Sequence, residues 1–346
     1  MKAIHTLSLE ELERWMRDNG YPAYRAGQLY DWLWRHPAES WEEMRNLPLQ
    51  LREALARDFR MERIPVSDMQ ESADGSVKYV LRLEDGREVE TVLIPSGGRS
   101  TVCVSSQVGC PLGCAFCATA RMGFVRNLDI YEMFAQVLLA RRESERRFGH
   151  PLGNLVWMGM GEPLLNFDAF AGAVGRVTAP DGLAMSPSRI TISTSGVTGG
   201  IIRLARTLPA VNLAVSLHSA DDRQRGELMP VARRYPLPAL SDALAEYHRI
   251  TRQRITIEYM LLKGINDSQR HADLLLNFCR RFPVRINVIE YNPHPQAPFL
   301  PSDRVVEAAF VRRLEGCNLA VSVRRSKGRD IAAACGQLAN AKKKSE

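Results

Sequence analysis

The feature that most constrains the fold is a series of short apolar segments that recur along the chain with helix-length spacers between them. Segments with the length and residue types of buried β-strands lie at 155–158, 189–194, 211–217, 255–261 and 284–289. A sixth strand is expected near 101–105. Because strands that alternate with helices form parallel sheets, we expect an α/β fold. Six strand–helix units suit a partial, open (βα)6 barrel better than a closed eight-stranded one.

Polar motifs follow several of these predicted strands. Gly161 and Glu162 follow the strand at 155–158, where a glycine lets the backbone approach a ligand and a carboxylate can accept from a cationic amine. Later strands are followed by segments that contain Ser193, Ser216, Leu217, His218 and Asn292. Each motif alone is ordinary turn chemistry. Since ligands bind at the carboxyl ends of parallel strands, the motifs together predict one ring of polar groups.

The first 64 residues are predicted to form a small helical domain. Ser8 and Glu11 have the spacing of a capping box, and Asn19-Gly20 is a typical helix end. Four of the five tryptophans lie in this segment, namely Trp15, Trp32, Trp34 and Trp41. Such density is typical of a small aromatic core, and a surface that stacks on nucleic-acid bases is the alternative.

Residues 77–94 alternate with period two and predict a β-hairpin that turns at Asp85-Gly86. On the returning strand, Glu90 has the same parity as Val92 and Ile94. The pattern leaves two orientations open for Glu90, one inside an enclosed region and one solvated at a sheet edge. Residues 65–346 are expected to form one domain, with this hairpin, a barrel core over about 98–325 and a C-terminal segment that carries Cys335.

Basic residues exceed acidic ones by 46 to 39, which gives a formal net charge of +7. Arginine pairs recur along the chain, and such a surface suits a polyphosphate partner because neutralised phosphates release counterions. Acidic residues are interleaved with several pairs, so ordinary solvated helix faces are the alternative. No apolar run is long enough to span a bilayer and no signal-peptide pattern is present, so we expect a cytoplasmic protein.

A loop with the spacing Cys110-x3-Cys114-x2-Cys117 offers three thiolates without a fourth ligand nearby. A structural zinc site takes four protein ligands, whereas an iron–sulfur cluster held by three thiolates leaves one iron open. The spacing, with Phe116 before the last cysteine, resembles the radical-SAM signature, in which S-adenosylmethionine (SAM) fills that open position. A zinc ribbon that recruits Cys103 is the alternative, although the usual paired rhythm is missing.

Cys335 lies among alanines, after a basic run at 324–329. A cysteine in such surroundings is most often a small buried side chain, whereas the adjacent glycine and the preceding cations favour an exposed, activated thiolate. Cys279 and Cys317 lie in apolar helical surroundings, and we expect them to serve packing only. The odd total of seven cysteines argues against a disulfide framework.

The chain resembles the RlmN family of radical-SAM enzymes, which methylate adenosine at carbon 2 in ribosomal and transfer RNA. The matching segments are the cysteine loop and residues 103–110, 123–128, 159–166, 192–196, 216–218 and 334–338. The likeness extends over nearly the whole chain, including the N-terminal helical segment. It implies a partial radical-SAM barrel, a β-hairpin extension and an N-terminal domain that helps to bind RNA.

The resemblance also implies a mechanism, with one [4Fe-4S] cluster on Cys110, Cys114 and Cys117 and two SAM molecules per turnover. One SAM methylates Cys335, and a second gives a radical that abstracts hydrogen from that methyl group. The resulting carbon radical adds to the adenine ring and crosslinks protein and RNA. A base matching Glu90 then removes the ring proton, and Cys103 attacks Cys335, which releases the product and leaves a disulfide.

The implied SAM-contacting set comprises Gly161, Glu162, Ser193, Ser216, Leu217, His218 and Asn292. The implied partners are 23S rRNA, methylated in the peptidyl transferase centre, tRNA, methylated 3′ of the anticodon, and an electron donor such as flavodoxin. A monomer without membrane attachment is expected. Two alternatives stay open: a member of the Cfr family, which methylates adenine carbon 8, and a zinc-stabilised RNA-binding module without catalysis. Residues 161–166 fit RlmN better than Cfr.

Overall fold

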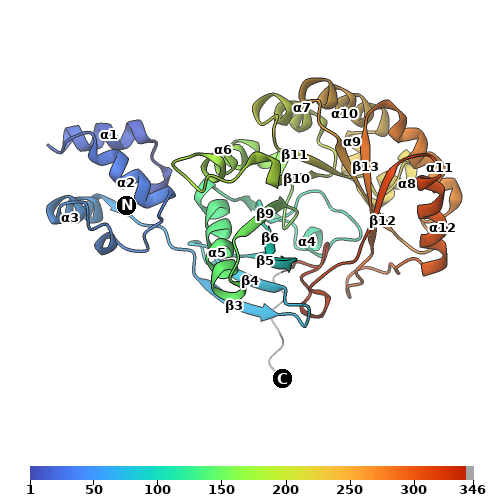
Figure 1. Ribbon diagram of the computed structural model, residues 1–346, viewed down its shortest axis with the longest axis horizontal. Coiled ribbons are helices and arrows are strands. Elements are labelled where there is room, and N and C mark those ends of the chain that lie inside the picture. The colour runs from blue at the N-terminus through green and yellow to red at the C-terminus, as the bar shows by residue number, and fades with distance from the viewer. Residues whose placement is uncertain (340–346) are drawn as a thin grey trace.

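The computed structural model describes residues 1–339 and is built around a ten-stranded sheet (Figure 1). The strand order is β14–β13–β12–β11–β10–β9–β6–β5–β4–β3, and the strands from β6 to β14 run parallel. The parallel strands are β6 (Arg99–Cys103), β9 (Leu152–Trp157), β10 (Ile190–Thr194), β11 (Asn212–Ser216), β12 (Ile255–Leu261), β13 (Val284–Glu290) and β14 (Ala320–Arg324). The predicted α/β class and its parallel sheet are therefore confirmed.

Helices follow each parallel strand up to β13. They are α5 (Ile130–Phe148), α6 (Phe167–Thr178), α7 (Thr198–Thr207), α8 (Asp222–Leu228), α9 (Val231–Arg234), α10 (Leu237–Thr251), α11 (Gln269–Phe278) and α12 (Arg304–Glu315). Six strand–helix units result, as predicted for the partial barrel. The sequence did not predict the final strand β14, because this edge strand is largely exposed and lacks an apolar run. Within residues 1–339, no helix is both long and apolar enough to cross a membrane.

The predicted hairpin consists of β4 (Val77–Arg82) and β5 (Glu88–Ser96), which pair antiparallel with Val80 opposite Glu90. A third antiparallel strand, β3 (Val66–Glu71), extends the sheet beyond β4. The period-two analysis missed β3 because its side chains are nearly all exposed, so no alternation of apolar and polar residues marks it. On its other side, β5 pairs with β6 and so joins the hairpin to the parallel strands.

The N-terminal segment folds into α1 (Leu9–Asp18), α2 (Arg25–Trp34) and α3 (Leu49–Asp58), which lie to one side of the sheet (Figure 1). The short strands β1 (Lys2–Ala3) and β2 (Phe59–Arg60) pair in parallel and close this segment. The Ser8 capping box is present as predicted. Trp34 is buried with its ring 5.2 Å from that of Phe134 on α5, and the other three tryptophans are half-buried against the same apolar cluster. The aromatic density is thus core, as expected.

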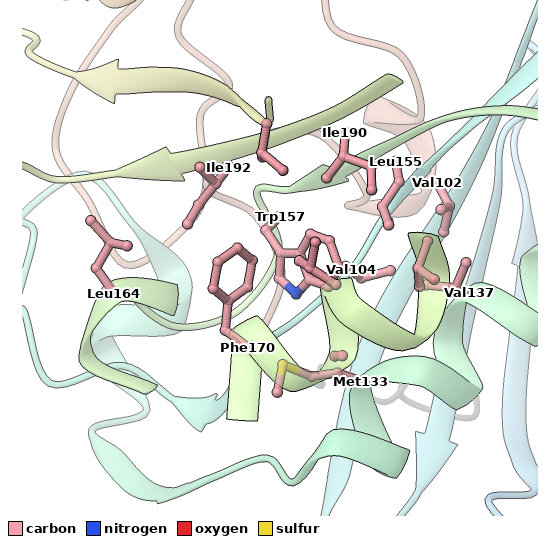
Figure 2. Packing of buried hydrophobic residues seen from close by; sticks show 14 of the residues in the cluster. Val102, Val104, Met133, Val137, Leu155, Trp157, Leu164, Phe170, Ile190 and Ile192 are labelled. Atoms are coloured by element: carbon pink, nitrogen blue, oxygen red, sulfur yellow. The ribbon is translucent and has the colours of Figure 1, made fainter. Parts of the chain in front are cut away.

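The centre of the apolar core lies where α5 and α6 cover β6, β9 and β10 (Figure 2). Trp157 at the end of β9 meets Phe170 of α6 edge to face, with ring centroids 5.0 Å apart. Val137 of α5 is fully buried in the same layer. Asp129 begins α5 with a capping box, in which its carboxylate accepts from the Glu132 main-chain N–H. This packing fixes the β9 end, which carries the Gly159–Glu162 motif, against the rest of the sheet.

Substituting Val137 with alanine should lower the free energy of unfolding by about 2 kcal/mol, because it removes two fully buried methyl groups from a close-packed layer. Val305→Ala on α12 is the matched control, since Val305 is 79% exposed and its truncation should cost less than about 0.5 kcal/mol. Urea denaturation followed by circular dichroism measures both. Equal midpoints for the two variants would contradict the assignment of this layer as the core.

Candidate active site

The cysteine loop begins where a short two-stranded clip ends. The clip pairs β7 (Gln107–Gly109) with β8 (Phe124–Asn127), and α4 (Ala118–Arg121) follows the loop. Gly109 has φ +74°, and a Cβ at this position would meet the Gly123 carbonyl oxygen at 1.8 Å, so only glycine fits. The loop is tied to α8 by the main-chain N–H of Ala115, which donates to the Leu228 carbonyl at 2.9 Å.

The three loop thiols lie within electrostatic range of one another. Burial raises the pKa of Cys110 to about 12 and that of Cys114 well above its ordinary value, and the neighbouring thiols and Glu162 contribute in the same direction. Such thiols are protonated at neutral pH, and a bound metal centre would deprotonate them. Cys103 lies next to Cys335 and not next to the cysteine loop. The loop therefore lacks the fourth ligand that the zinc-ribbon alternative requires.

The donor set fits an iron–sulfur cluster better than a single ion. A structural zinc ion brings four ligands to within about 2.3 Å of one point. Among residues 1–339, no three His, Cys, Asp or Glu side chains are gathered so that they could hold one metal ion. In a cluster each thiolate binds a different iron, so three spaced thiols with no fourth protein ligand suit it.

Glu162 joins the ends of two strands beside the loop. Its carboxylate accepts from the main-chain N–H of Ser195 at 2.8 Å and of Leu164 at 3.2 Å, while its own N–H donates to Gln107 Oε1 at 2.8 Å. Burial raises the pKa of Glu162 to about 7. Gly161 has φ +96°, and a Cβ there would meet the Gln107 Cβ at 2.5 Å. The predicted motif therefore forms a tightly fitted turn with a buried carboxyl group.

The next strand ends add neutral polar groups. Ser193 and Ser216, on adjacent β10 and β11, have hydroxyl oxygens 3.4 Å apart. Leu217 is fully buried, and His218 follows it with φ +54°. The Nδ1 of His218 accepts from the main-chain N–H of Met260 at 3.1 Å, and burial lowers the pKa of His218 to about 3, so the ring is neutral. Its ring also meets Phe116 of the cysteine loop edge-on at 5.0 Å.

Asn292, after the last long parallel strand, connects the sheet to the C-terminal segment. Its side-chain amide donates to Ser326 Oγ at 2.8 Å and to the Cys335 carbonyl at 3.3 Å. Its Oδ1 atom is buried and accepts no hydrogen bond from residues 1–339. A buried unpaired acceptor is costly, so this oxygen is well suited to receive a donor from a ligand.

The thiols of Cys103 and Cys335 interact although 232 positions separate them in the chain. Burial raises the pKa of Cys103, and the charge of Cys335 adds to the effect. Cys335 is exposed to solvent, as one of its two predicted environments requires, yet desolvation of its sulfur by the surrounding chain raises the pKa of the thiol, with Glu258 acting in the same direction and Arg324 in the opposite one. All seven cysteines are free thiols, so the expected Cys103–Cys335 disulfide is not supported in this state.

Cys279 is buried as predicted, but Cys317 is exposed after α12, so its assignment to packing is wrong.

Glu90 takes the inward one of its two predicted orientations and is fully buried. Lys78 on β4, equally enclosed, places its Nζ 3.3 Å from the Glu90 carboxylate. The same carboxylate accepts from the main-chain N–H of Ala339 at 2.9 Å. Sequence analysis missed Lys78, although a lysine of matching parity on the paired strand was the available signal.

The C-terminal segment that carries Cys335 is held at several points. Asp330 accepts from Ser72 Oγ at 2.6 Å and from the Ala73 N–H at 3.0 Å, in the turn between β3 and β4. At the other end, the N–H of Ala118 donates to the Gly336 carbonyl at 2.8 Å, directly beside Cys117. These bonds bring the hairpin, the cysteine loop and Cys335 together.

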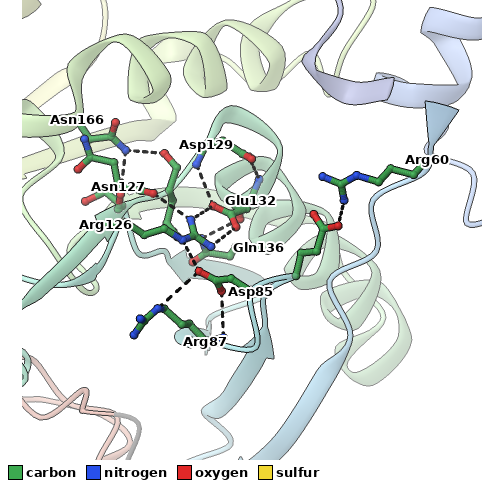
Figure 3. Close-up of polar contacts among 12 residues, drawn as sticks. Arg60, Asp85, Arg87, Arg126, Asn127, Asp129, Glu132, Gln136 and Asn166 are labelled. Carbon is green, nitrogen blue, oxygen red and sulfur yellow. Dashed lines mark hydrogen bonds and ion pairs between the residues drawn. The ribbon is translucent and has the colours of Figure 1, made fainter. Parts of the chain in front are cut away.

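A polar network connects the β7–β8 clip to the hairpin turn and to α5 (Figure 3). Arg126 of β8 forms two hydrogen bonds with Glu132 of α5, at 2.7 and 2.8 Å, and one with Asp85 of the hairpin turn at 2.6 Å. Asn166 donates to the Ser106 and Leu128 carbonyls at 3.0 and 2.7 Å. Burial raises the pKa of Asp129, at the start of α5, to about 6. The network fixes the cysteine loop to both the hairpin and α5.

Arg225 of α8 is a second functional candidate that the sequence did not reveal. It is fully buried, and its guanidinium donates to the Leu217 carbonyl at 3.1 Å and the Ser195 carbonyl at 2.8 Å. Burial lowers the pKa of Arg225 to about 10, so it stays charged at neutral pH. It lies among the cysteine loop and the ends of β10 and β11.

Residues 104–276 match the Radical SAM superfamily, and residues 3–61 match the ribosomal RNA large subunit methyltransferase N-terminal domain. A crystal structure of a radical SAM methyltransferase from Sphaerobacter thermophilus superimposes with a TM-score of 0.92 at 41% identity, over 98% of this chain and 99% of that one. The fold and the cysteine loop thus define a radical SAM enzyme, a class whose chemistry requires a [4Fe-4S] cluster and SAM.

Two relatives narrow the identification. The chain is 45% identical to a probable dual-specificity RNA methyltransferase RlmN of Flavobacterium psychrophilum, over 98% of both sequences. It is 43% identical to the dual-specificity RNA methyltransferase RlmN of Syntrophobacter fumaroxidans, over 97% of both. This chain belongs to the RlmN family of RNA methyltransferases, as its motifs predicted.

Gly161→Ala should weaken SAM binding at least tenfold, because the added Cβ would displace Gln107 and with it the Glu162 main chain. Equilibrium dialysis of SAM against the anaerobically reconstituted protein measures the affinity. Gly175→Ala on α6 is the matched control, since nothing lies within 4 Å of a Cβ there and its affinity should be unchanged. An unaltered affinity in Gly161→Ala would show that this turn does not shape the SAM site.

Proposed function

We propose that this enzyme methylates carbon 2 of an adenosine in the peptidyl transferase centre of 23S rRNA and of an adenosine 3′ of the anticodon in tRNA. The observation that carries the proposal is the placement of Cys335 between the cysteine loop and Cys103, with the buried Glu90 on the adjoining hairpin. Carbon 2 of adenine is electron-poor and does not attack a sulfonium methyl group. A methyl group carried on one protein thiol avoids this direct attack, and a second thiol can release the product.

Cys110, Cys114 and Cys117 would hold the cluster, and Gly161, Glu162, Ser193, Ser216, Leu217, His218 and Asn292 would contact SAM. The bound cluster and SAM supply a carbon-centred radical. Glu162 suits the amino group of SAM, because an ammonium beside a buried carboxyl group would favour its charged form. The buried Oδ1 of Asn292 offers a further acceptor on the opposite side. Two SAM molecules per turnover are proposed, one as methyl donor and one as radical source.

Cys335 would carry the transferred methyl group. Desolvation of its sulfur and the nearby Glu258 raise the pKa of this exposed thiol, so it must lose its proton before it attacks a methyl sulfonium. Arg324 favours the thiolate and so assists that loss. The turn that carries Cys335 is held beside Cys117 by the Ala118–Gly336 hydrogen bond, which places the carrier next to the cluster loop.

Glu90 would remove the proton from the adenine ring once the base is joined to Cys335 through carbon, and the odd electron of that adduct would return to the bound iron–sulfur cluster. Lys78 Nζ lies 3.3 Å from its carboxylate and forms a buried ion pair with it. The Ala339 N–H that donates to the same carboxylate places the C-terminal segment over it. That segment must therefore give way before a base of the RNA can reach Glu90.

Cys103 would release the product. Its sulfur attacks the Cys335 sulfur, so that a disulfide forms and the bond between sulfur and the base-linked carbon breaks. The electron pair stays on that carbon, which takes up a proton and becomes the methyl group of the product. A cellular dithiol then reduces the disulfide and restores both thiols.

We further propose that the helical segment 1–64 helps to hold the RNA, and that residues 65–346 perform the chemistry. The segment contains no cysteine and lies to one side of the sheet (Figure 1). The match of residues 3–61 to a ribosomal RNA methyltransferase N-terminal domain supports this division. An electron donor such as flavodoxin, a monomeric state and a cytoplasmic location complete the proposal.

The reconstituted enzyme, given SAM and dithionite, should convert one adenosine in a 23S rRNA fragment and one in a tRNA into 2-methyladenosine. Liquid chromatography with mass spectrometry, calibrated with 2-methyl and 8-methyl standards, identifies the product. Cys335→Ala should give none, because no thiol remains to carry the methyl group. Formation of 8-methyladenosine would refute carbon-2 chemistry in favour of the Cfr-type alternative.

Cys103→Ala should retain methylation of Cys335 but accumulate RNA joined to the protein, because no thiol remains to break the carbon–sulfur bond. The adduct should run as a slow, nuclease-sensitive band in a denaturing gel. Cys279→Ala is the matched control, since this buried cysteine lies outside the site and its removal should leave no adduct. Normal turnover by Cys103→Ala without an adduct would show that Cys103 does not resolve the crosslink.

A further inference from the structure

Arg225 carries a buried charge for which the protein offers only neutral acceptors. It is fully buried on α8 and donates to the carbonyls of Leu217, Ser195 and Tyr235, at 3.1, 2.8 and 3.5 Å. Among residues 1–339, no carboxylate forms an ion pair with it. Asp222, on the same helix, acts on it from an exposed position and is engaged by the Leu237 N–H. Burial of an unpaired charge costs several kcal/mol, so an anion is expected beside it.

Helix α8, which carries Arg225, is hydrogen-bonded to the cysteine loop right beside Cys114, so an anion held by this loop would lie near the guanidinium. The Arg225 guanidinium and the Cys114 sulfur lie within electrostatic range of each other. The geometry is fixed, because the Leu228 carbonyl, one turn further along α8, accepts from the Ala115 N–H at 2.9 Å. The Met229 N–H in turn donates to the Arg225 carbonyl at 2.7 Å. The guanidinium is thus held at a set distance from the loop.

We propose that Arg225 tunes the reduction potential of the iron–sulfur cluster on this loop and favours its reduced form. The inference rests on the cluster assigned under the proposed function. A cluster bound by three thiolates is negatively charged, and it becomes more negative when a donor such as dithionite adds one electron. A fixed positive charge in a low-dielectric setting stabilises the more negative state most, which raises the potential. Glu162, which also faces Cys110 and Cys114, opposes this effect.

Arg225 is a positioning and tuning residue, because it acts through the cluster and does not contact the substrate. Its bonds to Ser195 and Leu217 also explain why a cation of this shape is needed, since the planar guanidinium reaches both strand ends at once. A purely structural role would depend on these bonds alone. A tuning role depends on the charge, and the two are separable by measuring the potential.

The test is a redox titration of the reconstituted full-length enzyme, without SAM or RNA, followed by electron paramagnetic resonance of the reduced cluster. Arg225→Gln and Arg225→Met should lower the ratio of reduced to oxidised cluster at least tenfold at a fixed potential, which is 59 mV for a one-electron couple. Arg225→Lys keeps the charge and should stay near the wild-type midpoint. Arg223→Gln removes an exposed cation two positions earlier on α8 and should leave the midpoint unchanged.

A second pair of variants tests the charge without removing Arg225. A Cβ built on Gly196 would meet both Arg225 Nη2, at 3.2 Å, and the methyl groups of Leu240, at 3.3 Å, so these two side chains share that space. Leu240→Glu should neutralise Arg225 and lower the midpoint relative to Leu240→Gln. Iron and sulfide assays accompany every titration.

Two failures are distinguishable in this design. If wild-type protein binds no iron and sulfide, the cluster assignment itself is wrong. If the neutral Arg225 variants or Leu240→Glu hold a full cluster with the midpoint of their matched controls, the tuning role of Arg225 is refuted while the proposed function stands.

Discussion

The hydrogen bond from the Ser195 main chain to the buried Glu162 carboxylate is the contact from which the site is built. It joins the ends of β9 and β10, and Gln107 holds the other side of the same residue next to the cysteine loop. Because burial raises the pKa of Glu162 to about 7, its charge state depends on what approaches it. The turn therefore combines a rigid frame with a carboxyl group that responds to a cationic ligand.

Much of the fold follows from local rules. Capping boxes at Ser8 and Asp129 fix where α1 and α5 begin, and the buried parallel strands show as apolar runs. The strands β3 and β14 escaped prediction for a physical reason. Both lie at the edges of the sheet and expose most side chains, so only their main-chain pairing defines them.

The candidate site likewise has a part that the sequence predicts and a part that it does not. The cysteine loop and the strand-end motifs are short contiguous patterns, and the sequence displays them directly. Lys78 and Arg225 do not appear in such patterns, because each acquires its role from contacts with residues far away in the chain. Glu90 was ambiguous for a related reason, since strand parity tells which residues share a face but not which face the C-terminal segment will cover.

The attachment of the C-terminal segment to the β3–β4 turn and to α4 affects the order in which the parts of the site form during synthesis. The Ser72–Asp330 contact joins residues 258 positions apart, and the Thr119–Leu338 contact joins residues 219 apart. Contacts of such separation form late, because the intervening chain must be in place first. The cysteine loop and the strand-end motifs that contain Glu162, Ser193 and His218 are synthesised well before Cys335. A growing chain therefore holds the three loop cysteines and the Glu162 turn before it holds Cys335, the thiol proposed to carry the methyl group.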